Sequence, residues 1–368
     1  MTSLSRLRDA IRPLAPDAAV EAQRHLDTLT KPPGSLGRLE EIAVRLAALR
    51  GGPPRVGRPV VFTFAADHGV VAEGVSAYPQ TVTAQMVENF LRGGAAINVL
   101  ARQAGARVVV ADFGIAGVEP APIYSMPPST GTGLAATINS PTLVRCPIGP
   151  GTANMARGPA MTREQATRAI ERGAALADEA MDGGADLLAT GEMGIGNTTA
   201  ASAITAAITG LPPEAVTGRG TGVNEAVWRR KIEVVGAALR VNRPDGSDGL
   251  DVLAKVGGFE IAGLVGVILA GAARSVPVVI DGFISTAAAL VAATLAPEAR
   301  HALFASHRSA EPGHGFALAH LDLVAYLDLS LRLGEGTGAA LFIHLARAAA
   351  LIYGEMATFK SAGVDGPR

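Results

Sequence analysis

The chain has very little cysteine: Cys146 is the only one in 368 residues. A single cysteine excludes an intrachain disulfide and a metal site built on several thiolates. This usage is typical of a reducing compartment, so we predict a cytoplasmic location. Aromatic residues make up 4% and charged residues 18%, whereas hydrophobic residues reach 48%, which is typical of a globular rather than a disordered or fibrous chain.

An excess of either charge is also missing. The formal net charge of −1 offers no electrostatic reason to expect nucleic acid or an anionic membrane surface as a partner. Charges interrupt the first 29 residues every few positions, so the apolar core of a signal peptide is lacking. The most apolar window, residues 259–283, is broken by Arg274 and Pro277 and predicts a buried helix and a buried strand rather than a membrane span.

Several catalytic motifs are absent. Asp67 and His68 invite comparison with a Ser–His–Asp hydrolase, but no Gly-x-Ser-x-Gly elbow supplies the nucleophile. No Gly-x-Gly-x-x-Gly with an acidic residue about twenty positions later is present, which disfavours a nicotinamide-dependent oxidoreductase. His307, His314 and His320 lack the spacing of metal ligands. We therefore predict neither a metal nor a cofactor.

The chain instead alternates helical patterns with apolar runs. Apolar runs at 60–70, 106–115, the start of 185–199 and 275–285 predict strands, and helical patterns occupy 4–50, 82–104, 162–182, 224–242 and 257–273. This alternation predicts an α/β protein with a parallel sheet covered by helices on both faces. We expect residues 1–55 and 335–368 to pack together as a small helical domain beside a large α/β domain, 56–334. The Pro-rich stretch 119–133 is predicted to be a surface loop.

Each predicted strand ends in polar or glycine residues. These endings are Asp67-His68-Gly69, Asp112-Phe113-Gly114, Gly191-Glu192 and Asp281-Gly282. In open parallel sheets the binding site lies outside the carboxyl ends of the strands. The endings therefore predict which edge of the sheet carries the site.

The segment "TGEMGIGNTTAAS" (190–202) is a glycine-rich turn from a strand into a helix. Glycines permit the tight turn, and Asn or Thr can cap the helix, whose free N–H groups suit a phosphate. The residues concerned are Gly191, Gly194, Gly196, Asn197, Thr198 and Thr199. Without a following Gly-Lys-Ser/Thr it is not a Walker A loop, and an ordinary strand-to-helix turn remains the alternative.

A second glycine-rich loop, "TGRGTG" (217–222), contains Gly220 and precedes Lys231 at helical spacing. One cation that reaches a phosphate cradled by backbone groups is a common arrangement. The alternative for Lys231 is a solvated side chain on a helix face.

Two carboxylates lie in glycine-rich turns, Glu192 and Glu335. In "LRLGEGTGAAL" (331–341), Glu335 separates an amphipathic pattern, 316–333, from an apolar one, 340–354. A turn between two helices needs neither three glycines nor a charge, so Glu335 is a turn residue, a helix cap or a base. Two carboxylates beside ligand loops favour an acid–base or charge-stabilising pair.

Seven segments taken together carry a resemblance to a known family. In order from residue 31 to 341 they are "KPPGSLGRLE", "AADHGV", "GEMGIGNTT", "KVGGFEIAG", "DGFIS", "SHRSAE" and "RLGEGTGAAL". With them the chain resembles the nicotinate-nucleotide–dimethylbenzimidazole phosphoribosyltransferase family of cobalamin lower-loop assembly. The resemblance implies a homodimer of chains that each have a Rossmann-like domain and a small helical domain.

The implied reaction transfers ribose 5-phosphate from nicotinate mononucleotide to 5,6-dimethylbenzimidazole, giving α-ribazole 5′-phosphate and nicotinate. Adenine, a phenol or another benzimidazole are alternative acceptors. A phosphate-binding module without catalysis is the further alternative, and the two glutamates disfavour it.

The resemblance also implies roles for particular residues. Glu335 would be the catalytic base, and Glu192 would stabilise the electron-deficient ribose. The implied ribose and phosphate contacts are Gly194, Gly196, Asn197, Thr198, Thr199, Gly220 and Lys231. The implied contacts of the benzimidazole are Tyr78, Pro79, Met86 and Leu333.

Overall fold

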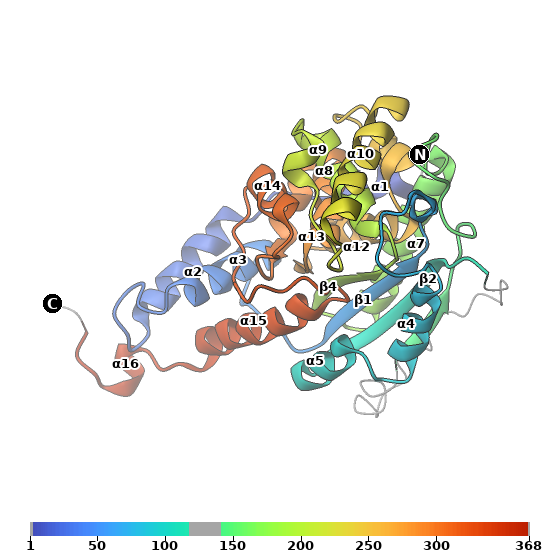
Figure 1. Ribbon diagram of the computed structural model, residues 1–368. Coiled ribbons are helices and arrows are strands. Elements are labelled where there is room, and N and C mark those ends of the chain that lie inside the picture. Colours follow the sequence, from blue (N-terminus) through green and yellow to red (C-terminus); the bar gives the residue numbers. More distant parts are fainter. Residues whose placement is uncertain (1–2, 118–140, 367–368) are drawn as a thin grey trace.

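The computed structural model describes residues 3–117 and 141–366. Within these ranges the chain forms one six-stranded parallel sheet in the order β3-β2-β1-β4-β5-β6 (Figure 1). The strands are β1 (Pro59–Ala66), β2 (Arg107–Gly114), β3 (Thr142–Arg145), β4 (Leu187–Met193), β5 (Val278–Ile280) and β6 (Leu303–Ala305). The predicted parallel α/β sheet is confirmed. The predicted loop 119–133 lies outside the described residues.

The sheet is buried on both faces because its strands are apolar throughout. In β1, alternate side chains point to opposite faces: Phe62 and Phe64 belong to one core cluster, and Val61 and Ala65 to the other. The first face is covered mainly by α7 (Arg163–Asp182), α12 (Phe259–Ala273) and α13 (Phe283–Leu295). The second is covered by α4 (Val82–Leu91), α5 (Ala96–Ala104) and α15 (Thr337–Glu355).

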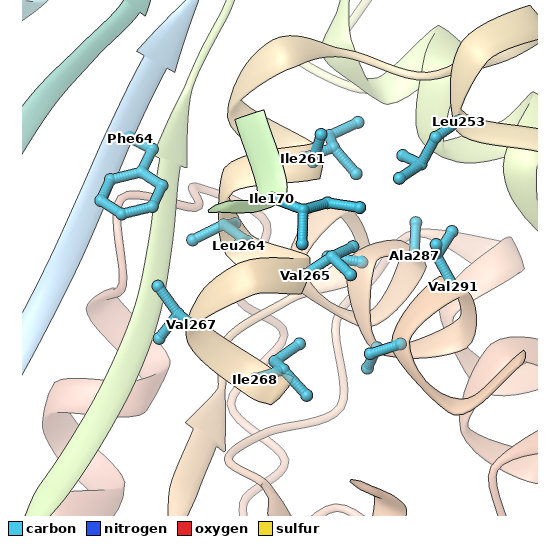
Figure 2. Packing of buried hydrophobic residues seen from close by; sticks show 14 of the residues in the cluster. Phe64, Ile170, Leu253, Ile261, Leu264, Val265, Val267, Ile268, Ala287 and Val291 are labelled. Atoms are coloured by element: carbon cyan, nitrogen blue, oxygen red, sulfur yellow. The ribbon is translucent and has the colours of Figure 1, made fainter. Parts of the chain in front are cut away.

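Helix α12 lies in the middle of the first layer and is buried along almost its whole length. Figure 2 shows Leu264 of α12 on the side of Phe64 of the sheet, and Val265 beside Ile170 of α7 and toward Ala287 of α13. A helix that is apolar on all sides needs such an all-round covering. The packing explains why the most apolar window of the sequence is not a membrane span.

Several predicted boundaries were wrong. The predicted helix 82–104 is two helices, α4 and α5, because Gly93 adopts a left-handed φ of 78° between them. The predicted strand 275–285 is shortened to β5, since α13 begins at Phe283. Strands β3 and β6, with four and three residues, are too short for a period to emerge from the sequence. Neither strand was therefore predicted from the sequence.

The amphipathic pattern 316–333 is not a continuous helix. Helix α14 (Pro312–His320) ends within the pattern, and the chain continues as a non-helical strap over 321–334. The strap is held by backbone hydrogen bonds, Arg308 N–H to the Leu327 carbonyl at 2.7 Å and Ala310 N–H to the Leu331 carbonyl at 3.0 Å. It brings the turn around Glu335 back to the sheet.

Helices from the N-terminal part of the chain lie beside α15, which extends outward from the sheet (Figure 1). Helix α2 (Pro16–Thr28) packs on α3 (Arg38–Arg50), and α3 packs on α15. The Thr30 N–H also donates to the Ala357 carbonyl at 3.0 Å. Helix α1 (Ser3–Ala10) instead packs on α7 and α12 of the sheet layer. We therefore propose a small helical domain that begins at α2 rather than at residue 1.

Candidate active site

The turn around Glu335 consists of consecutive residues with left-handed backbone. The φ angles are 88° at Gly334, 63° at Glu335 and 95° at Gly336. A Cβ on Gly334 would collide with the Glu192 carboxylate, and a Cβ on Gly336 would lie 2.7 Å from Val61 Cγ1. The flanking glycines therefore serve both the left-handed backbone and the close approach to the sheet. These two requirements explain why glycine flanks Glu335 on both sides.

Asp281, just after β5, holds this turn at the sheet. Its carboxylate accepts the N–H groups of Gly336 at 3.2 Å, Gly338 at 2.8 Å and Ala339 at 3.1 Å, all at the start of α15. A carboxylate at this position satisfies helix donors that have no partner within the helix. Burial raises the pKa of Asp281, opposed by His307 and by these N–H groups. From the sequence, Asp281 is predicted only as a strand ending, and this anchoring contact is not predicted.

The Glu335 side chain is buried, with 5% of its surface exposed. Its Oε2 accepts the N–H of Ile97 at 3.3 Å, at the start of α5, and its carbonyl accepts the Thr63 hydroxyl at 2.9 Å. Burial raises the pKa of Glu335, the Ile97 N–H opposes that rise, and Asp281 adds to it. A carboxylate with a raised pKa is a stronger base than one in water.

Glu192 ends β4 beside the Glu335 turn. Burial, followed by the charges of Asp281 and Glu260, raises the pKa of Glu192 to about 8. Its Oε2 accepts a hydrogen bond from the Asn197 side-chain amide, which stabilises the carboxylate. Several acidic groups thus share a buried region. A positive charge on a ligand would reduce the electrostatic repulsion among them.

The two glycine-rich loops meet at one pocket. Helix α8 (Asn197–Thr209) begins after Gly196, whose φ is 95°, and its first turn faces the loop 217–222. The pocket is small, with a cavity volume of about 30 Å³. The predicted residues that line it are Gly194, Gly196, Asn197, Thr198, Gly220 and Lys231. Thr199 is buried in the first turn of α8 and does not line the pocket.

Lys231 lies on α10 (Glu225–Asn242) with only 1% of its surface exposed. Its Nζ donates to Thr198 Oγ1 at 2.7 Å and contacts the Gly218 carbonyl at 3.4 Å. The alternative of a solvated lysine is therefore wrong. Burial lowers the pKa of Lys231 to about 8, while the charge of Glu311 opposes the shift. A buried cation at the start of a helix, where the helix dipole is positive, is suited to bind an anion.

The four residues predicted to contact the benzimidazole lie outside this pocket. Tyr78 and Leu333 expose 50% and 58% of their surfaces, and Pro79 is also exposed. Met86 is half-buried on α4. A hydrogen bond connects helix α4 to the turn before α8, because Thr83 Oγ1 accepts the Ile195 N–H at 3.1 Å. Their role in base binding stays a prediction.

His68 and Glu260 form a further buried pair that the sequence analysis did not connect. Their Nε2 and Oε1 atoms are 2.6 Å apart, and a Cβ on Gly194 would lie 3.2 Å from the same Glu260 oxygen. The pair therefore packs against the turn at Gly194, which follows β4. Glu260 is far from His68 in sequence and inside an apolar helix, so no spacing rule could have linked them.

Two absences were predicted, and the described residues bear on each. In the described ranges no group of three or more His, Cys, Asp or Glu side chains is arranged to hold a metal ion. Of the helices in the same ranges, α15 has the length and apolar composition to cross a membrane, but half of its apolar window is buried in the protein. The absence of a metal and of a membrane span stays a prediction.

Similarity to known proteins first defines the class. A family model described as phosphoribosyltransferase matches residues 11–364. The fold and the paired glycine-rich loops thus belong to a phosphoribosyltransferase enzyme.

Individual relatives then define the family. The chain is 55% identical over 367 residues to nicotinate-nucleotide–dimethylbenzimidazole phosphoribosyltransferase of Roseiflexus sp. (strain RS-1), with 100% of this chain and 99% of that protein covered. The protein of that name from Desulforamulus reducens is 53% identical over 369 residues, with 99% of each covered. The chain belongs to the nicotinate-nucleotide–dimethylbenzimidazole phosphoribosyltransferase family, and the resemblance seen in the sequence is confirmed.

Solved structures agree with this assignment. The crystal structure of nicotinate-nucleotide–dimethylbenzimidazole phosphoribosyltransferase from Thermus thermophilus matches with a TM-score of 0.85 and 51% identity, over 95% of this chain and 99% of that one. A structure of CobT from the same organism matches with a TM-score of 0.87 and 51% identity, over 96% and 100%. The Rossmann-like α/β fold is confirmed.

Proposed function

We propose that the enzyme transfers the 5-phosphoribosyl group of nicotinate mononucleotide to 5,6-dimethylbenzimidazole in cobalamin biosynthesis. The products are α-ribazole 5′-phosphate and nicotinate. The observation that carries the proposal is the buried Glu335, beside Glu192 and on the same sheet edge as the pocket with Lys231. The names of the relatives support the same substrates.

Glu335 acts as the base in this proposal. One benzimidazole nitrogen attacks C1′ of the ribose, and the bond from C1′ to the nicotinate nitrogen breaks with its electron pair on nicotinate. The benzimidazole becomes cationic, so its remaining N–H proton turns acidic and passes to the Glu335 carboxylate. The raised pKa of Glu335 favours this transfer. Attack opposite the leaving group inverts C1′ from β to α.

Glu192 and the pocket hold the rest of the substrate. Nicotinate leaves as a neutral pyridine, so no general acid is needed. The electron-deficient ribose is stabilised by the Glu192 carboxylate, whose ionised form the positive pyridinium ring of the substrate would favour. The phosphate occupies the pocket of α8 N–H groups and Lys231. Neither step requires a metal or a cofactor.

We also propose a homodimer. Val324 and Leu329 of the strap expose 71% and 53% of their surfaces, which a partner subunit would cover. Light scattering in solution should give a mass near twice 37.4 kDa. A monomeric mass at micromolar concentration would contradict the proposal. The cytoplasmic location stays a prediction.

Replacement of Glu335 by Gln tests the function. The amide keeps the size of the side chain but cannot accept the proton at neutral pH. We expect turnover to fall by ~10²–10⁴-fold while nicotinate mononucleotide still binds. Turnover is measured as nicotinate release, and binding by calorimetry. Near-normal turnover would overturn the assignment of Glu335 as base.

Product analysis with a panel of bases separates the alternatives. The enzyme is incubated with nicotinate mononucleotide and dimethylbenzimidazole, adenine, a phenol or benzimidazole. Preferred use of dimethylbenzimidazole supports the proposed acceptor, and preferred use of another base replaces it. No nicotinate release with any base would indicate a binding module without catalysis.

A further inference from the structure

Glu311 is a buried carboxylate next to the pocket, and the proposed reaction does not use it. It precedes α14 and exposes 7% of its surface. Its Oε1 accepts the Gly220 N–H at 2.8 Å, while Oε2 is buried without a hydrogen-bond partner among the described residues. A side chain at Gly218 would collide with this carboxylate. The loop 217–222 is thus fitted closely around a negative charge.

The same loop contacts a buried positive charge. The Lys231 ammonium contacts two neutral oxygens, Thr198 Oγ1 and the Gly218 carbonyl. A buried ammonium without a nearby opposite charge is strongly disfavoured. Two cations also lie at this end of the pocket: Arg219 lines it and pairs with the exposed Glu225, and Arg332 donates to the Gly220 carbonyl at 3.1 Å. Glu311 is the acidic group that favours the protonated form of Lys231.

We propose that Glu311 is a positioning residue of the phosphate subsite, which fixes the Gly220 peptide and supplies the counter-charge for Lys231 before a phosphate arrives. The inference rests on the proposed function, because it assumes that the pocket receives the phosphate of nicotinate mononucleotide. Glu311 acts through Gly220 and Lys231 and does not itself contact the substrate. The negative charge of Glu311 stabilises the protonated form of the buried Lys231 in the enzyme without phosphate.

The fixed Gly220 peptide also connects the phosphate subsite to the base. Glu311 accepts its N–H, and Arg332, three positions before Glu335, donates to its carbonyl. The N–H and the carbonyl of Gly220 belong to successive peptide groups, so the two contacts hold the backbone on both sides of this residue. A shift of Glu311 would therefore displace the loop 217–222 directly, and the strap 321–334 through Arg332.

Two substitutions separate charge from position. Glu311→Gln keeps an acceptor for the Gly220 N–H and removes the charge. Lys231 of the free enzyme should then lose its proton at a lower pH. We expect the alkaline fall of kcat/KM for nicotinate mononucleotide to move down by ~0.5–1 pH unit.

Glu311→Asp keeps the charge but shortens the side chain. It should raise KM for nicotinate mononucleotide ~3–10-fold and leave the alkaline fall in place.

A matched control removes a charge nearby. Glu214 is exposed on α9 (Pro213–Val216), so Glu214→Gln should keep the wild-type profile. An unchanged alkaline fall in Glu311→Gln would overturn the counter-charge role. An unchanged KM in Glu311→Asp would overturn the positioning role. If Glu311→Gln does not fold, the KM of Glu311→Asp decides: a raised KM supports the proposal, and an unchanged KM overturns it.

A readout without turnover separates this inference from the proposed function. Inorganic phosphate should raise the melting temperature of the wild-type enzyme by binding the folded state, and it should protect Glu311→Gln much less at pH 8.5. Equal protection of both proteins, or none of the wild type, would overturn the inference. Protection that differs as expected, together with an absence of nicotinate release, would leave Glu311 in its role and overturn the proposed reaction instead.

Discussion

The phosphate side and the base side of the site are built differently, although both lie at the same edge of the sheet. On the phosphate side, Lys231 and Asn197 expose 1% and 6% of their surfaces. On the proposed base side, Tyr78 and Leu333 expose 50% and 58%. The proposed phosphate subsite is therefore buried before a ligand binds, whereas the side chains of the proposed base contacts are exposed.

The difference has a physical reason. A phosphate is bound by backbone N–H groups and a buried cation, which must be ordered in advance because their desolvation is costly. A flat aromatic base needs mainly apolar contact, which exposed side chains can provide on binding. We therefore expect changes near the buried carboxylates and the phosphate pocket to have larger effects than changes on the base side.

Gly334→Ala should have the largest effect of these changes. The new Cβ would collide with the Glu192 carboxylate and would force a left-handed φ on alanine. Displacement of the Glu192 and Glu335 carboxylates should lower kcat by ~10²-fold. Gly354→Ala, where a Cβ meets nothing within 4 Å, is the matched control. Wild-type kcat in Gly334→Ala would contradict the proposed geometry.

Lys231→Met should act on the phosphate side alone. Loss of a charge-assisted contact should raise KM for nicotinate mononucleotide ~10–100-fold at pH 7, while KM for dimethylbenzimidazole changes little. Steady-state kinetics with each substrate varied in turn measures both constants. The control is Arg230→Met, one position away on the exposed side of α10. Equal rises in the two KM values would remove the distinction between the sides.

Tyr78→Ala and Leu333→Ala should have smaller effects, and on the opposite substrate. Because both side chains are exposed, each loss should raise KM for dimethylbenzimidazole only ~2–5-fold. KM for nicotinate mononucleotide should stay at the wild-type value. No change in either constant would remove Tyr78 and Leu333 from the proposed base contacts.

Glu192→Gln should change stability modestly, with a defined pH dependence. The pKa of Glu192 is raised to about 8, above the value of about 4.5 for an unfolded chain. Its stabilising contribution is complete below pH ~4.5 and is lost as pH rises to ~8. The melting temperature of the variant relative to wild type should therefore increase by ~2–4 °C between pH 5 and pH 8 without substrate.

Calorimetry at the two pH values checks this expectation. Glu214→Gln should show the same difference from wild type at both pH values, because its side chain is exposed. A pH-independent difference for Glu192→Gln would mean that the carboxyl group is already ionised in the empty site.

The sequence predicted the fold class and the edge of the sheet that carries the site. Apolar strands between helices required a covered parallel sheet, and the polar endings at Asp67, Glu192 and Asp281 located its carboxyl edge. The meeting of the two glycine-rich loops at one pocket agrees with the anion site expected from 190–202 and 217–222. Short strands, the strap 321–334 and the placement of α1 were not predictable from local patterns.

By itself the sequence determined which local conformations are allowed: glycines at 334 and 336 permit the left-handed turn, and the apolar periods define the buried faces. Tertiary structure alone decided which charges are buried together. Asp281 meets the start of α15, Glu311 meets Gly220, and Glu260 meets His68 across long separations in the chain. A local pattern has no information about such contacts, because the pKa of a carboxyl group depends on burial and on the charges that the fold brings near it.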